Sequence, residues 1–315
     1  MHYSVLLNES IEGLNIKPDG IYVDATLGYA GHSSKILEKL TTGHLYAFDQ
    51  DEKAVKYSFD KLEKINPHNF TIIKSNFLSL KERLNELGVT KVDGILFDLG
   101  FSSPQIDDAS RGFSFMKDAP LDMRMNQDDK FSAYDVVNKY KIEELSNIFY
   151  KYAEEKFSKS IAKGIVDNRP INTTLELVNV IKRSVPMKYY LTNHPEREIF
   201  QAIRIEVNSE LDVLQGVLPD AISMLNPGGR ICVITFHSLE DRIVKQEFKK
   251  NSEVNSLVRG LKEDEIPDEF KPKLKLINKK PIVASEKELE ENSRSKSAKL
   301  RIVERVWLTW ERILS

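Results

Sequence analysis

The sequence predicts an α/β fold with a mostly parallel sheet that is interrupted by a helical segment. Over the first hundred residues, short runs rich in β-branched and aromatic residues alternate with stretches of helical spacing. The middle of the chain shows helical patterns without a convincing strand, and the α/β pattern then returns. We therefore expect one α/β domain, built from residues 1–108 and 196–315, with a helical domain inserted at residues 109–195.

The first part of the α/β domain should contain four strands joined by helices. Its apolar runs are short enough for strands, and they are separated by amphipathic stretches, as in a parallel sheet covered on both faces. The expected strands are GIYVDATLG (20–28), HLYAFD (44–49), NFTIIKS (69–75) and KVDGILFD (91–98), and the expected helices cover 33–40, 52–65 and 79–88.

The inserted domain and the second part of the α/β domain have their own signals. Ser132 to Asp135 and Thr173 to Glu176 both have the spacing of a capping box, which opens a helix. A long helix is expected from Glu198 to Met224. A turn at NPGG (226–229), a buried strand at RICVITF (230–236) and two later strands, KLKLINKKPIV (273–283) and AKLRIVERVW (298–307), should follow.

Composition narrows the class of protein. The chain has 315 residues, of which 41% are hydrophobic and 30% charged, as expected of a soluble globular protein. Its one cysteine, Cys232, lies in an apolar run, so we expect it in the core and no disulfide within the chain. No signal peptide or membrane span is evident, and a cytoplasmic location is predicted.

Charge is unevenly distributed along the chain. The net charge is −2, yet residues 271–305 hold 11 Lys and Arg against 5 Asp and Glu. Such a basic stretch suits contact with phosphates, although a solvated lysine-rich surface would have the same composition.

Candidate ligand-binding residues follow the predicted strands. The loop Gly28–His32, Asp49, the pair Asn76–Phe77 and Asp98 lie at or just beyond the ends of the first four strands. Ligands of open parallel sheets bind at the carboxyl ends of the strands. A dinucleotide fingerprint is absent, because Ala30 and Ser33 stand where G-x-G-x-x-G requires its second and third glycines.

The pattern therefore favours a nucleoside ligand without a pyrophosphate, and S-adenosylmethionine is the obvious candidate. In that interpretation Asp49 accepts hydrogen bonds from the ribose hydroxyls, Phe77 lies against the adenine, and the loop backbone meets the methionine end. Two alternatives stay open: Asp49 could cap the helix that starts near Glu52, and Phe77 could belong to the core. No metal site is predicted.

Several long motifs resemble the RsmH (MraW) family of bacterial ribosomal RNA methyltransferases. They are HYSVLLNESIEGL, DGIYVDATLGYAGHS, DGILFDLGFSSPQIDDASRGFSFMKDAPLDMRM, REIFQAIRIEVNSEL, LNPGGRICVITFHSLEDRIVK and RSKSAKLRIVER. The resemblance implies a class I S-adenosylmethionine-dependent methyltransferase fold, with a Rossmann-like, mostly parallel seven-stranded sheet and an inserted helical domain. It also implies N4-methylation of a cytidine, cytosine 1402, in the 16S rRNA of the small ribosomal subunit.

The resemblance also implies the residues that contact the cofactor. These are Ala30, Gly31, His32, Asp49, Phe77, Asp98 and Gln105. Many members have glycine where this chain has Ala30, and binding through the backbone should survive the added methyl group. Oligomeric state is not given by the sequence, and a homodimer remains open.

The stretch DLGFSSPQ (98–105) should carry the chemistry. Asp98 stands where methyl donor and target should meet, so it could hold the cofactor, orient the target base, or do both. An acceptor that binds an N4 proton of cytosine would localise the nitrogen lone pair and stabilise the positive charge that develops there. Ser102, Ser103 and Gln105 could then fix the cofactor and the base edges. Alternatively, this loop only forms a turn into the insertion.

Two further stretches are candidates for the target pocket. His237, the second candidate catalytic residue, lies in TFHSLEDR (235–242) with Glu240, Asp241 and Arg242, although the two carboxylates could simply occupy the first turn of a helix. In RGFSFMKDAPLDMRM (111–125), aromatic side chains could stack on an extruded base and arginines could hold phosphates. The alternative for this stretch is a hydrophobic seat for the inserted domain. Its candidate residues are Arg111, Phe113, Phe115 and Arg124.

The preferred function is therefore methylation of RNA. A methyltransferase for a small molecule or a protein would have the same cofactor half, and only tight binding to ribosomal RNA separates the two. A non-catalytic nucleotide-binding module in ribosome assembly is the other alternative, which would fail to transfer a methyl group.

Overall fold

The chain folds into two compact units. The computed structural model describes residues 4–100, 105, 108–262 and 265–307. One unit combines Met1–Gly100 with Asp212–Ser315, and the other is Phe101–Leu211. The helical unit thus extends beyond the expected range 109–195 at both ends. The unit extends beyond residue 195 because a helix over Pro195–Asn208 packs against other helices of the insertion.

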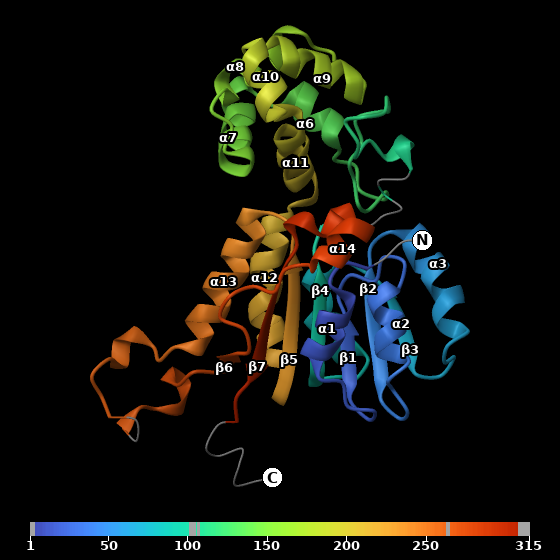
Figure 1. Cartoon of the computed structure of the whole chain (residues 1–315), viewed down its shortest axis with the longest axis vertical. Coiled ribbons are helices and arrows are strands. Elements are labelled where there is room, and N and C mark those ends of the chain that lie inside the picture. The colour runs from blue at the N-terminus through green and yellow to red at the C-terminus, as the bar shows by residue number, and fades with distance from the viewer. Residues whose placement is uncertain (1–3, 101–104, 106–107, 263–264, 308–315) are drawn as a thin grey trace. The chain divides into compact units, whose positions relative to one another are not determined.

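A seven-stranded, mostly parallel sheet forms the centre of the first unit, which confirms the predicted fold class. The strand order is β3-β2-β1-β4-β5-β7-β6, and β7 runs antiparallel to both of its neighbours (Figure 1). The strands are β1 (Ile21–Asp24), β2 (His44–Asp49), β3 (Phe70–Lys74), β4 (Val92–Asp98), β5 (Leu225–Thr235), β6 (Leu274–Leu276) and β7 (Lys299–Arg305).

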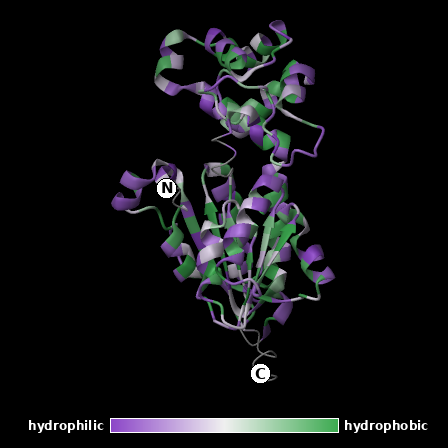
Figure 2. Cartoon of the chain, turned by 90° about the vertical axis from the view of Figure 1, so that its right-hand side faces the viewer, coloured by the Kyte–Doolittle hydropathy of each residue, from purple (hydrophilic) through white to green (hydrophobic). Residues whose placement is uncertain are grey.

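Helices cover both faces of this sheet. Successive residues of a strand point to opposite faces, so Ile95 and Phe97 of β4 join one core cluster and Leu96 joins the other. Strands buried on both sides are accordingly apolar along their length, as Figure 2 shows. One cluster contains residues of α1 (Leu7–Leu14), α2 (Gly31–Leu37) and α3 (Glu52–Glu63), and the other contains residues of α4 (Leu80–Glu86), α12 (Glu210–Met224) and α13 (Ser238–Ser252).

The second unit is helical and has a core of its own. The two predicted capping boxes are confirmed: Ser132 and Thr173 are the N-caps of α6 and α9, each paired with the acid three residues later. The regular helices described here are α6 (Ala133–Lys139), α7 (Ile142–Ala153), α8 (Ser158–Asp167), α9 (Thr174–Arg183), α10 (Met187–Asn193) and α11 (Pro195–Asn208).

Three predicted elements differ from the structure. The long helix expected over 198–224 is two helices, α11 and α12, because Ser209 takes a left-handed conformation (φ 50°) that ends α11. The turn expected at NPGG lies inside β5, where Gly228 has φ 79° and the register against β4 shifts. The strand expected over 273–283 is confined to β6, followed by one isolated bridge at Ile282.

Short elements complete the first unit. They are η1 (Phe77–Ser79), η3 (Ser256–Val258), η5 (Asp268–Phe270), α14 (Glu286–Glu291) and η6 (Ser293–Ser297), with η2 (Ala109–Arg111) in the helical unit. Among the described residues, no helix has the length and apolar character needed to cross a membrane.

Candidate functional site

Three aspartates end three neighbouring strands. Asp24, Asp49 and Asp98 are the last residues of β1, β2 and β4. These strands are parallel and adjacent in the sheet, so their carboxyl ends lie at one edge. The strand order reverses between β1 and β4, and such a switch point is where open α/β sheets bind ligands.

The loop after β1 leads into the amino end of α2. Gly28 and Ala30 both have left-handed backbones, with φ 50° and 53°, and α2 begins at Gly31. A left-handed conformation costs a residue with a Cβ more than glycine, which is the physical reason a glycine suits position 30. Ala30 is nevertheless fully buried, so its methyl group is packed in the core and not directed into solvent.

Asp49 anchors this loop. Its Oδ2 accepts a hydrogen bond from Gly28 N at 2.9 Å, and its Oδ1 accepts one from Asp51 N at 2.8 Å. Burial raises the pKa of Asp49 to about 7. The helix α3 is capped by Asp51, whose side chain accepts from Lys53 N, so the alternative role of Asp49 as the helix cap is wrong.

Side chains of α3 hold the carbonyl groups of the same loop, a feature that the sequence did not reveal. Ser58 donates its hydroxyl to Gly28 O at 2.7 Å, and Lys61 Nζ donates to Tyr29 O and Ala30 O at 3.0 and 3.2 Å. The only local signal is that Ser58 stands on the buried face of α3, between Ala54 and Leu62.

Asp24 and Thr26 connect the first loop to β4. The buried Asp24 accepts hydrogen bonds from Thr26 N at 3.1 Å and from the Ser33 hydroxyl at 2.6 Å, and burial raises its pKa. Thr26 Oγ1 in turn accepts a hydrogen bond from Asp98 N at 2.7 Å. The ends of β1 and β4 are thereby held in one arrangement.

Asp98 has an enclosed carboxyl oxygen that no described residue binds. Its side chain keeps 26% of its surface exposed, but Oδ1 is buried and forms no hydrogen bond with any described residue. Burial, with Asp24 and Glu240 nearby, raises the pKa of Asp98 to about 8. Buried polar atoms are normally paired, so an acceptor that no described residue binds, at the carboxyl end of β4, is a candidate contact for a ligand.

His32 faces Asp98 from the first turn of α2. Its Nε2 lies 3.1 Å from Val5 O and its Nδ1 lies 3.6 Å from Asp98 Oδ2. Burial lowers the pKa of His32 to about 4, so the ring is neutral at physiological pH. Because Val5 O can only accept, the proton is assigned to Nε2, which leaves Nδ1 as an acceptor turned toward Asp98.

Phe77 lies beyond the end of β3, at the start of η1. Its ring meets Phe97 edge to face at a centroid distance of 5.6 Å and packs partly buried against the core. Its neighbour Asn76 donates to Gln50 Oε1 at 3.1 Å, which ties the end of β3 to the residue after Asp49. Phe77 is thus packed against the core on one side and partly exposed on the other.

His237 is the N-cap of α13, directly after β5. Both of its ring nitrogens are buried without a hydrogen-bond partner among the described residues, although Nε2 lies 2.9 Å from Glu240 Oε1. Glu240 Oε2 accepts from Phe236 N and His237 N, and Asp241 binds Arg301 through both oxygens. The two carboxylates therefore have the structural roles that the sequence left open.

The stretch 111–125 belongs to the helical unit, where its polar and aromatic groups are engaged. The buried Arg111 donates to Arg124 O and Met125 O, and Arg124 pairs with Asp122 at 2.7 Å. Phe113 and Phe115 pack on the helical core, which favours the interpretation as a hydrophobic seat. Gln105 is buried in the same unit, and Ser102 and Ser103 lie outside the described residues.

Comparison with known protein families now identifies the chain. The MraW methylase family matches residues 1–306. The chain belongs to this family. As a member of the MraW methylase family it is an S-adenosylmethionine-dependent methyltransferase, and the alternative of a non-catalytic nucleotide-binding module is set aside.

Solved structures that this chain resembles include other methyltransferases. They are a putative rRNA methylase from Clostridium thermocellum (12% identity, TM-score 0.46, 97% of this chain and 100% of that chain covered), an rRNA methylase from Streptococcus thermophilus (11%, 0.43, 98% and 100%) and a putative methyltransferase from Streptococcus mutans in complex with SAH (13%, 0.44, 97% and 100%).

The residues at the edge of the sheet fit the cofactor of a MraW methylase. Asp98 Oδ1, which no described residue binds, offers an acceptor, and each Asp49 oxygen retains a lone pair beyond its backbone bond. The amides at the start of α2 offer donors in the same loop region.

Proposed function

We propose that the protein methylates N4 of cytosine 1402 in the 16S rRNA of the small ribosomal subunit. Membership of the MraW methylase family supports methyl transfer. The observation that carries the choice of an amino group is the enclosed Oδ1 of Asp98, an acceptor in need of a donor at the carboxyl end of β4. An exocyclic amine supplies that donor.

The proposed cofactor contacts come from four adjacent strand ends. Asp49 accepts the ribose hydroxyls, since its carboxylate is already oriented by two backbone amides. Phe77 offers a ring face to the adenine, and the backbone of the loop meets the methionine end. The remaining cofactor-binding residues of the proposal are Ala30, Gly31, His32, Asp98 and Gln105.

When bound, S-adenosylmethionine supplies a methyl group on a positively charged sulfur, which is already a good electrophile. The protein's part is then to align the nucleophile and to stabilise the charge it develops. Asp98 accepts a hydrogen bond from N4 through Oδ1, which turns the nitrogen lone pair toward the methyl group. Thr26, which accepts from Asp98 N, keeps this strand end in position.

Asp98 must be ionised to act in this way. A neutral carboxyl has one acceptor fewer and does not stabilise positive charge on N4. Because its pKa is raised, the Asp98 carboxyl is largely protonated at neutral pH in the free protein. A nearby positive charge lowers the pKa of a carboxyl group, so Asp98 would give up its proton when a sulfonium is bound beside it.

His237 is the second residue that we place at the target base. Its ring nitrogens are enclosed, with Nε2 2.9 Å from Glu240 Oε1, and the residue lies beyond the end of β5, next to β4 in the sheet. The proposal places the enzyme in the cytoplasm, where small subunits are assembled, and it holds for a monomer or a homodimer.

A mass comparison of small-subunit RNA tests the proposed function. RNA from cells with the protein should carry one methyl group more on the fragment containing cytosine 1402 than RNA from cells without it. Complementation with the wild-type chain should restore this mass, and Asp98→Asn, which keeps the shape but not the charge, should not. Equal masses, or a methyl group that appears only on protein or a small molecule, would refute the assignment.

A further inference from the structure

The helix α13 separates its charges by face. Val244 and Phe248 point into the core, whereas Arg242, Lys245 and Lys249 are exposed. Residues three, four and seven apart lie on the same side of a helix, so these cations form one stripe. Lys250 is also exposed, and its Nζ lies 3.9 Å from Glu247, while Lys249 Nζ lies 3.8 Å from Glu253, just beyond the helix.

The two acidic residues in the first turn of α13 are engaged within the fold. Glu240 caps the helix, and Asp241 binds Arg301 of β7 at 2.7 and 3.0 Å. Lys299 Nζ also lies 3.8 Å from Asp241, and Arg301, Lys299 and Lys245 together lower the pKa of Asp241. One carboxylate cannot neutralise three cations, so positive charge is left over at the surface.

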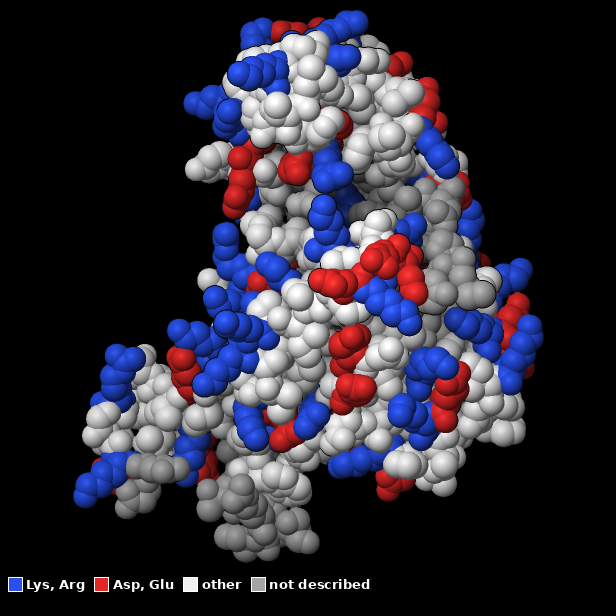
Figure 3. All heavy atoms as spheres, viewed as in Figure 1, with Lys and Arg blue, Asp and Glu red and all other residues white. Residues whose placement is uncertain are grey.

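This positive charge begins at the edge of the sheet that holds Asp98. The helix α13 starts three residues after the end of β5, and the antiparallel β7 places Lys299 opposite Thr235, the last residue of β5. Figure 3 shows Lys and Arg gathered along α13, with Asp and Glu concentrated where α14 lies. We call Arg242, Lys245, Lys249, Lys250 and Lys299 the α13 surface.

The α13 surface lacks the features of a protein-binding site. Centres of protein interfaces are usually apolar and rich in aromatic residues. The exposed large hydrophobic side chains of the described residues include none from α13. Exposed cations without an apolar centre suit a phosphate backbone, for which electrostatic attraction supplies most of the affinity.

We propose that the α13 surface binds the phosphates of the RNA next to the target nucleotide. The inference rests on the proposed function, because it takes RNA as the substrate. The basic stretch 271–305 is then divided by the fold: Lys299 joins α13, while Arg301 pairs with Asp241 and α14 adds carboxylates of its own. The RNA should accordingly run along α13 and not across α14.

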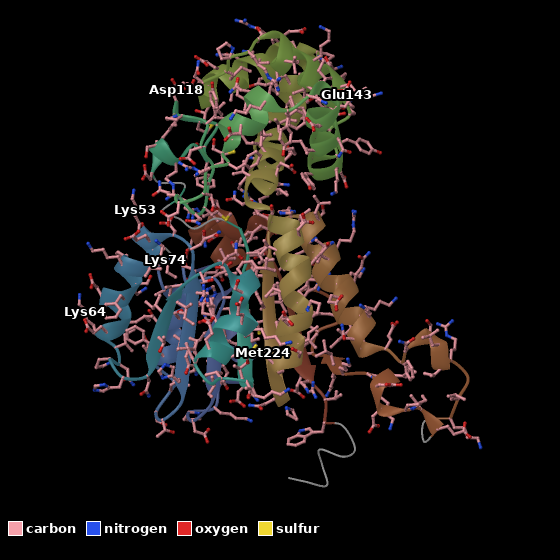
Figure 4. All side chains as sticks on the ribbon, turned by 180° about the vertical axis from the view of Figure 1, so that it is seen from behind. Lys53, Lys64, Lys74, Asp118, Glu143 and Met224 are labelled. Atoms are coloured by element: carbon pink, nitrogen blue, oxygen red, sulfur yellow. The ribbon has the colours of Figure 1, made fainter. Side chains whose placement is uncertain are left out.

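The test is a triple variant in which Lys245, Lys249 and Lys299 are changed to Gln. Asp241 keeps Arg301 as its partner, so the fold should be preserved. The matched control changes Lys39, Lys56 and Lys64 to Gln, which removes the same charge from exposed positions of the same unit. Lys64 lies at the outer end of α3, directed away from the sheet (Figure 4).

Binding of a labelled decoding-region RNA is measured across salt concentrations, with cofactor affinity and thermal unfolding as further readouts. A lysine on single-stranded RNA contributes about 0.7 to the slope of log K against log salt, so three contacts contribute about 2. At about 0.1 M salt the same relation gives roughly a hundredfold loss of RNA affinity for the triple variant. The control and the cofactor affinity should be unchanged.

The outcomes separate this inference from the proposed function. If the wild-type protein binds and methylates the RNA while the triple variant and the control behave alike, the α13 surface is wrong and the function stands. If the wild-type protein transfers no methyl group to the RNA, the proposed function itself fails. An equal loss of cofactor affinity in the triple variant would show that the changes disturb the site, and would also overturn the inference.

Discussion

Binding of S-adenosylmethionine should release a proton from Asp98. In the free protein, burial and the neighbouring Asp24 and Glu240 raise the pKa of this carboxyl to about 8. The neutral His32 supplies no charge to offset them, since its own pKa is lowered to about 4. A sulfonium placed beside Asp98 favours the ionised carboxyl, so the pKa falls in the complex and the proton leaves.

The affinity for S-adenosylmethionine should therefore depend on pH, because binding is linked to the loss of this proton. The group is protonated in the free protein below pH 8 and ionised in the complex, so affinity rises with pH until it levels off above about 8. With a pKa in the complex below about 5, affinity should increase roughly a hundredfold from pH 6 to pH 9, or about 2.7 kcal/mol.

Calorimetry in buffers of different ionisation enthalpy measures the protons released. S-adenosylhomocysteine is the matched ligand, because it keeps the ribose and the amino-acid end but lacks the positive sulfur. It should therefore leave Asp98 protonated, while any proton released by Asp49 is common to both ligands. At pH 7 the methyl donor should release close to one proton more than S-adenosylhomocysteine, and Asp98→Asn should abolish the difference. Equal proton release by the two ligands in the wild-type protein would refute the reasoning.

Four further predictions follow from the site. Asp49→Ala should weaken binding of the methyl donor by roughly 1.5–3 kcal/mol for each ribose hydrogen bond lost, with thermal unfolding showing a folded protein, and unchanged affinity in calorimetry would contradict the assignment. Asp98→Ala should reduce turnover far more than RNA affinity, and equal losses in a folded variant would contradict its place at the reacting centre. Lys61→Met removes two hydrogen bonds to the loop 28–30 and should weaken cofactor binding about tenfold without changing RNA affinity. The control, Lys35→Gln, removes an exposed pair with Glu38 and should change neither affinity. Labelled methyl incorporation should be far greater into assembled or nearly assembled small subunits than into naked RNA. It should fall steeply as salt rises and should be very poor with cytidine alone. A short oligonucleotide that reacts as well as the subunit, without salt dependence, would refute the shape-dependent part of this proposal.

The sequence predicted the parallel sheet and the edge at which the candidate residues meet. An acid directly after an apolar run is visible in the sequence, and parallel strands bring such positions to one edge. That is why Asp49 and Asp98 could be singled out before the structure. The capping boxes at Ser132 and Thr173 were equally predictable, because a helix cap depends on neighbours within one turn.

Predictions that depended on contacts between residues distant in sequence were less accurate. The helix expected over 198–224 is interrupted at Ser209, where the backbone turns left-handed although the apolar periodicity continues. The aromatic and arginine residues of 111–125 suggested a base pocket, yet Arg111 donates hydrogen bonds to carbonyl groups of its own unit. Residue type indicated what these side chains could do, and packing decided what they contact.

By itself, the sequence determined which residues follow the strands and therefore lie at the candidate site. Only the tertiary structure decided their charge states and partners: the raised pKa of Asp98, the contacts of Ser58 and Lys61 with the loop 28–30, and the grouping of Lys299 with α13. The physical reason is that strand and helix patterns arise from neighbours along the chain. Desolvation and charge pairing depend on groups that are distant in sequence and meet only when the sheet and its helices assemble.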